Sequence, residues 1–173
     1  MSLLGNPQNF ESPIQEHHVK IANDIQWISG TIKTLGDAHN YINQDDLTYW
    51  NIVDAHISPW SFTGLPNSHV SSIMVDRDNI QLMMLTDTEA LEAYRKPLRT
   101  SVVILNLPLL IICGEAPFLG EAKIENFFDY WKGTFLPLSS AKIHYLTETT
   151  TRLPSTVDLL FVNRHKIVSY ISG

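Results

Sequence analysis

Two stretches of the chain share one pattern of apolar and polar positions. Residues 73–83 and residues 160–170, which lie 87 positions apart, each begin with an apolar run that contains a valine just before the polar segment. An Asp or Asn follows, then Arg77 or Arg164, two polar residues, Ile and further strand-forming residues. Apolar runs on both sides of a polar, turn-forming segment are typical of two strands joined by a tight turn. The pattern therefore predicts the same strand–turn–strand segment near the end of each half of the chain.

Other matching positions extend this repeat over about 75 residues, at offsets of 84 to 87. Gly30 matches Gly114, and alanines and strand-forming residues recur around them in one order. Small insertions in loops explain the drift in offset, because loop-closure entropy changes little with loop length. We therefore expect a tandem duplication, with residues 13–85 as the first copy and residues 97–173 as the second.

The hydrophobic pattern predicts five short strands in each copy. Besides the two strands around the arginine turn, we expect strands at residues 19–23, 25–34 and 53–60, and at residues 101–106, 109–117 and 138–145. The third strand of each copy alternates between apolar and polar residues, which indicates an antiparallel strand with one solvated face. Gly30 and Gly114 lie inside the second strand of each copy, where a glycine marks a bulge or a sharp bend.

Helical periodicity separates the second strand from the third. In the second copy, one apolar helical face is formed by Ile124, Phe127, Phe128 and Trp131. The first copy only begins this pattern, at Ala38. We expect a short helix that packs on the sheet, and the alternative is an aromatic ligand pocket lined by Phe127, Phe128 and Trp131.

The remaining segments precede and connect the copies. Thr86 and Glu89 have the spacing of a capping box, and Pro97 ends the segment. Residues 86–96 are therefore expected to form a linker helix, and residues 1–12 an N-terminal arm.

Composition narrows the classes of function. Of the 173 residues, 44% are hydrophobic and 17% are charged, which favours a packed core over disorder. The net charge of -6 disfavours a general nucleic-acid binder, because such proteins need a basic face. Cys113 is the only cysteine, so the chain has no internal disulfide, and a reducing cytoplasm is the expected location. No apolar stretch reaches the roughly 20 residues that span a bilayer.

Recognisable catalytic motifs are absent from the sequence. It contains no glycine-rich phosphate loop, no nucleophile elbow and no zinc-protease motif. We therefore expect no enzyme activity, no catalytic residue, no cofactor and no metal. The candidate binding residues are those of the two arginine turns, Asp76, Arg77, Asn163 and Arg164, which would bind an anion or a protein partner, together with the aromatic residues Phe127 and Trp131.

A bent strand with a glycine and a closing Val-polar-Arg-x-x-Ile turn resemble the Sm-like fold, a five-stranded SH3-like barrel. Asp78 and His165 stand where that family usually has a glycine after the arginine. The resemblance implies that Arg77 and Arg164 occupy the turn that helps to clasp a base in RNA-binding members. The second copy also resembles an uncharacterised family of short bacterial domains, through its 135–143 segment and its closing turn.

These observations predict a mainly β (α+β) protein with two tandem five-stranded Sm-like or SH3-like bent-sheet units, each with a short helix. The expected function is a non-catalytic interaction module for protein–protein contact or regulation, with a protein partner or self-association and no membrane contact. One alternative is RNA or nucleotide binding through Arg77 and Arg164. A second alternative is a small-molecule pocket or an enzyme site between the repeats.

Overall fold

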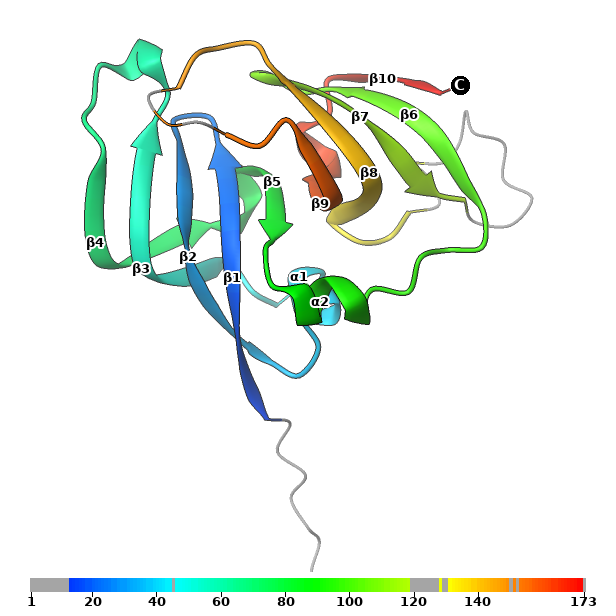
Figure 1. Ribbon diagram of the computed structural model, residues 1–173, viewed down its shortest axis with the longest axis horizontal. Helices are drawn as coiled ribbons and strands as arrows, with labels where there is room; N and C mark the ends of the chain where they lie inside the picture. The colour runs from blue at the N-terminus through cyan, green and yellow to red at the C-terminus, as the bar shows by residue number, and fades with distance from the viewer. Residues whose placement is uncertain are drawn as a thin grey trace, which may run out of the picture.

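The computed structural model describes residues 13–44, 46–118, 128, 131–149, 151 and 153–172 (Figure 1). The strands of the first half are β1 (Ile14–Asn23), β2 (Gln26–Leu35), β3 (Tyr49–Pro59), β4 (Ser68–Asp76) and β5 (Ile80–Leu85). Those of the second half are β6 (Thr100–Asn106), β7 (Leu110–Pro117), β8 (Phe135–Tyr145), β9 (Thr156–Asn163) and β10 (Ser169–Ser172). Two short helices, α1 (Ala38–Ile42) and α2 (Thr88–Ala93), and the 3-10 turns η1 (Ser61–Thr63), η2 (Arg77–Asn79) and η4 (Arg164–Lys166) complete the described elements.

All ten described strands belong to a single antiparallel sheet, in the order β10-β6-β7-β8-β9-β5-β1-β2-β3-β4. The prediction of two separate five-stranded units, each with a helix, is therefore wrong. The two halves join where β5 pairs with β9, with Leu82 opposite Val162 and Met83 opposite Phe161. All six residues of β5 are buried. Buried backbone groups need hydrogen-bond partners, and pairing with β1 on one edge and β9 on the other provides part of them and joins the halves into one sheet.

The helical predictions have different outcomes. In the first half, α1 begins at Ala38 as the pattern indicates, and Asp37 caps it by accepting a hydrogen bond from the His39 amide. The linker helix is shorter than expected, because α2 covers only Thr88–Ala93. The helix expected around Ile124 and Phe127 falls largely outside the described residues.

The order of strands is the same in both halves. It runs β5-β1-β2-β3-β4 in the first half and β10-β6-β7-β8-β9 in the second. The predicted bends at Gly30 and Gly114 are confirmed, because the pairing register shifts at each of these glycines. The strand facing each bend contains a residue with positive φ, Asp54 at 53° and Ser140 at 51°. The halves therefore share an order of strands, and their origin by duplication stays a prediction.

Among the described residues, two hydrophobic clusters form the core, and each contains residues from both halves. The cluster under the second half includes Trp27, Trp60 and Leu82 from the first. The cluster under the first half includes Phe135 and Phe161 from the second. The halves therefore bury apolar surface against each other as well as internally.

Polar contacts also connect the halves. The side-chain amide of Asn43 accepts a hydrogen bond from the Phe135 amide at 2.8 Å and donates one to the Phe135 carbonyl at 3.1 Å. Asn163 donates to the Ile80 carbonyl at 2.9 Å, and the Ser61 amide donates to the Glu148 carbonyl at 3.0 Å. Of the helices described, none has the length and apolar character that a membrane crossing requires.

Candidate functional site

Arg77, the first residue of the turn η2, is a buried side chain. Only 4% of it is exposed. Its guanidinium donates to the carbonyls of Ile42 at 3.2 Å and Leu47 at 3.4 Å, and lies 5.6 Å from the centroid of the Phe135 ring. Arg77 therefore holds the end of α1 and the following loop in place by hydrogen bonds, and it packs on an aromatic ring of the other half. A surface ligand does not reach this guanidinium.

Arg164 occupies the equivalent turn, η4, in more open surroundings. Its Nη1 donates to the Trp131 carbonyl, and its Nε lies 3.4 Å from Nε2 of His165. The half-buried side chain lines a depression of about 740 Å³, together with Lys132 and His165. Of the two arginines in the predicted site, Arg164 is the one in contact with a surface cavity.

Asp76 and Asn163 shape the two turns. Asp76 accepts hydrogen bonds from the Asp78 amide at 3.0 Å and from the side chain of Asn79 at 2.9 Å. Asn163 accepts one from the His165 amide at 3.0 Å. Its other side-chain group donates to the Ile80 carbonyl of the first half, as described above. These two residues hold the backbone of each turn in place, and Asn163 is fully buried.

The aromatic part of the predicted site is only partly described. Trp131 packs against the core of the second half, and its carbonyl accepts a hydrogen bond from Arg164. Phe127 lies outside the described residues. The structure therefore places Trp131, Asn163 and Arg164 close together, whereas Asp76 and Arg77 lie in the other half.

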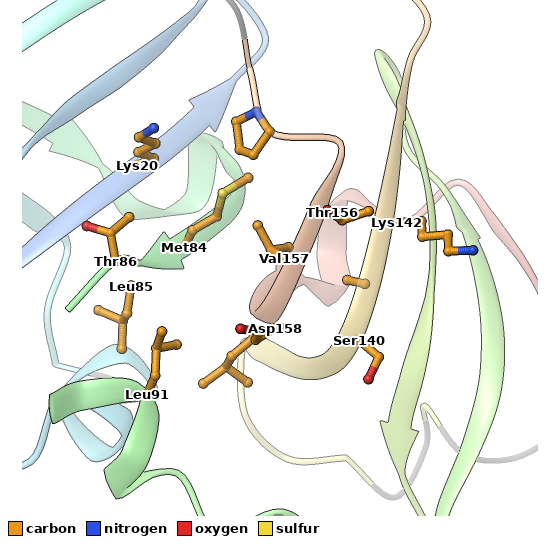
Figure 2. Close-up of a pocket in the computed structure, with 13 residues that line it drawn as sticks. Lys20, Met84, Leu85, Thr86, Leu91, Ser140, Lys142, Thr156, Val157 and Asp158 are labelled. Atoms are coloured by element: carbon orange, nitrogen blue, oxygen red, sulfur yellow. The ribbon is translucent and has the colours of Figure 1, made fainter. Parts of the chain in front are cut away.

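A cavity of about 590 Å³ lies between the halves, where β5 and β9 diverge beyond their two paired residues. Figure 2 shows Met84 and Leu85 on one side and Val157 on the other. Asp158 and Lys20 contribute charged groups to its lining, from the two halves. The volume lies within the range typical of small-molecule sites. A pocket between the repeats was one alternative suggested by the sequence, but none of its residues was predicted, because its walls come from strands of both halves.

An acidic depression of about 510 Å³ lies beside α1 and α2. It is lined by residues that include His17, Asp37, Asp87 and Glu89. Nδ1 of His17 is 3.5 Å from the Asp87 carboxylate, which also accepts a hydrogen bond from the backbone amide that follows His17, at 2.7 Å. Within the part of the chain that the structure describes, no three His, Cys, Asp or Glu side chains converge to hold a metal ion.

The outer strands of the sheet present a different kind of surface. β4 pairs only with β3, and β10 pairs only with β6, so each leaves one edge with no strand partner among the described residues. Apolar side chains are exposed on both strands, with Met74 60% exposed on β4 and Ile171 59% exposed on β10. Open strand edges of this kind are sites where another chain can add a strand.

Comparison of the chain with family models, with curated proteins and with solved structures finds no match. The geometry of the chain itself is therefore the basis for a functional proposal.

Proposed function

We propose that this chain is a non-catalytic protein-interaction module that binds its partners by strand addition at the outer edges of its sheet. The observation that carries the proposal is that the outer edges of β4 and β10 have no strand partner among the described residues and lie next to exposed apolar side chains. Main-chain hydrogen bonds along an edge provide affinity, and alternate side chains provide specificity. The single free thiol, Cys113, supports a reducing cytoplasm as the place where the module works.

The contrast between the two arginines supports contact with proteins over recognition of RNA or nucleotides. Two arginine turns that together read a nucleic acid would need both guanidinium groups at the surface. Arg77 instead donates to carbonyls inside the protein, and only Arg164 lines an open depression. In this proposal, Arg164 belongs to a protein-binding surface.

The test is affinity capture from an extract of the cells that produce the protein. Immobilised wild type is compared with Met74→Lys and Ile171→Lys, since a lysine on an edge strand discourages the addition of another strand. Leu98→Lys is the matched control, because Leu98 is fully exposed in the segment between the halves. The proposal predicts that bound proteins identified by mass spectrometry are lost with one or both edge variants and kept with the control. Equal capture by all four proteins would count against it.

The cavity between the halves supports a second candidate, a small-molecule site. Its apolar residues and its few charged groups from both halves are the features that such sites combine. Thermal-shift measurements with a library of cell metabolites test this candidate. A ligand that raises the unfolding temperature of the wild type should have no effect on Thr86→Trp, in which the indole occupies the cavity. A library that leaves the wild type unchanged would remove this candidate.

A further inference from the structure

We infer that the partner at these edges is a second copy of this chain, bound head to tail, with β10 of one copy added to β4 of the next. This inference rests on strand addition at the outer edges and specifies the partner. The basis for it is the junction inside the chain, where the fifth strand of one half already pairs with the fourth strand of the other half.

The internal junction joins the last strand of the first half, β5, to the fourth strand of the second half, β9. The two outer strands, β10 and β4, are the equivalents of β5 and β9 and could form the same kind of junction between copies. β10 is the last strand of the second half, and β4 is the fourth strand of the first half. The pairing of Leu82 with Val162 at the internal junction therefore corresponds to a pairing of Ser169 with Val75 between copies.

Burial differs between the internal junction and the outer edges in the way this arrangement requires. Phe161, which pairs across the internal junction, is 2% exposed. Met74 precedes Val75 on β4 in the same way that Phe161 precedes Val162 on β9, so it is the counterpart of Phe161. Met74 is 60% exposed. Likewise, all of β5 is buried, whereas two of the four residues of β10 are exposed. The outer edges thus carry the surface that is covered at the internal junction.

An arginine and an aromatic ring provide a second correspondence. At the internal junction, Arg77 lies over the ring of Phe135, which is fully buried. Phe135 begins β8 and pairs with Asn163, whereas Tyr49 begins β3 and pairs with Asp76. Tyr49 is therefore the counterpart of Phe135 in the first half.

Tyr49 is 53% exposed, and Arg164, the counterpart of Arg77, lines an open depression. Head-to-tail docking places the ring of Tyr49 from one copy against the guanidinium of Arg164 from the next. A cation–π contact of this kind is attractive and strengthens as water is excluded from it.

The distribution of charge favours contact between unlike halves. Residues 1–94 contain 12 acidic and 3 basic side chains, a net charge of -9, and residues 95–173 contain 6 acidic and 9 basic side chains, a net charge of +3. The acidic half includes β4 and the positively charged half includes β10. Contact between two acidic halves is repulsive, whereas contact of an acidic half with a basic half is attractive. A head-to-tail interface repeats from copy to copy and gives a closed ring or a filament.

The experiment is sedimentation velocity of the full-length chain over a range of concentrations, with variants at the two ends of the interface. The wild type should sediment as a multiple of 19.6 kDa. Tyr49→Arg places two arginines against each other and should weaken self-association by about tenfold or more. Arg164→Glu should also weaken it. An equimolar mixture of Tyr49→Arg and Arg164→Glu should recover assembly, because each copy then meets an intact or an oppositely charged partner surface.

The controls separate this inference from loss of folding and from the more general proposal. Leu98→Arg should sediment as the wild type does, and thermal unfolding of the Tyr49→Arg chain should show a folded protein. A wild type that stays at 19.6 kDa at every concentration would overturn the inference. So would unchanged association of Tyr49→Arg, or a mixture that fails to recover. Edge-dependent capture of a different protein by a monomeric wild type would leave strand addition standing and exclude self-assembly.

Discussion

Gly30 and Gly114 lie at the same bend of the two halves, and replacing each by alanine should have very different effects on stability. A Cβ added at Gly30 would lie 2.7 Å from Cγ2 of Ile52 and 2.7 Å from the carbonyl oxygen of Val53. At Gly114 the nearest atom, Cβ of Leu138, would lie at 3.3 Å. The first distance requires the facing strand to move, whereas the second requires a shift of a few tenths of an ångström.

The magnitudes follow from the nature of the contacts. Overpacking a well-packed interior costs about 1–3 kcal/mol, and the contact of Gly30 with a backbone oxygen places it near the upper end. Replacing glycine by alanine recovers about 0.4–1 kcal/mol by restricting the unfolded chain. Gly30→Ala should therefore lower the free energy of unfolding by about 2 kcal/mol, which corresponds to about 4–8 °C in Tm for a domain of this size. Gly114→Ala should change it by less than about 1 kcal/mol of either sign.

Urea unfolding followed by tryptophan fluorescence measures both variants under the same conditions. Trp27 and Trp60 lie in the core and report on the transition. The reasoning is refuted if Gly30→Ala is as stable as the wild type, or if the two variants lose the same stability. The first result would show that the backbone of β3 does not approach Gly30 as closely as described, and the second that the packing of the two bends does not differ as described.

Three further changes test other contacts. Asn163→Ala leaves the buried Ile80 carbonyl without its donor, and urea unfolding should show a loss of about 1–3 kcal/mol. Ser140→Gly relieves a positive φ in a non-glycine residue, and calorimetry should show a gain of up to about 1 kcal/mol. The hydrogen bond and charge of Lys96 lower the pKa of Glu115 from its ordinary value of 4.5, so this pair stabilises the fold above that pH and the effect is lost as the pH falls through the lowered pKa. Lys96→Gln should raise the pKa of Glu115 in an NMR titration. The variant should be less stable than the wild type at pH 7, and the two proteins should be equally stable at pH 2.

Much of the local structure can be read from the sequence. The two arginine turns form as predicted, with Asp76 and Asn163 accepting a hydrogen bond from the amide two residues later. The bends at Gly30 and Gly114 were predictable, because a glycine weakens the interior of a strand and is typical of a bulge or a close approach of another backbone. These features depend on neighbours in the chain, and local patterns are sufficient to find them.

The joining of the halves was not predicted, although one signal of it is present. The sequence of β5, Ile80–Leu85, is apolar at five of its six positions and does not alternate. A strand of that kind is buried on both faces. In contrast, β10 has a tyrosine and an isoleucine between two serines. A comparison of these two closing strands would have indicated that β5 is more deeply buried than β10. It would not have shown that β9 is the strand beside β5.

The candidate site shows the same limit. The sequence places Arg77 and Arg164 in equivalent turns, and the structure does so too. What the sequence cannot show is that Arg77 is covered by Phe135, which lies 58 positions further along the chain. The accessibility of each arginine depends on this long-range packing, and so does the cavity between β5 and β9.

The interleaved core has a consequence for how the molecule comes apart. Because Phe135 lies in the cluster beneath the first half and Trp60 in the cluster beneath the second, neither half retains a complete interior once the other is removed. Melting should consequently be cooperative across the whole chain, and a protease cut near Leu98 should leave two fragments that remain bound to each other.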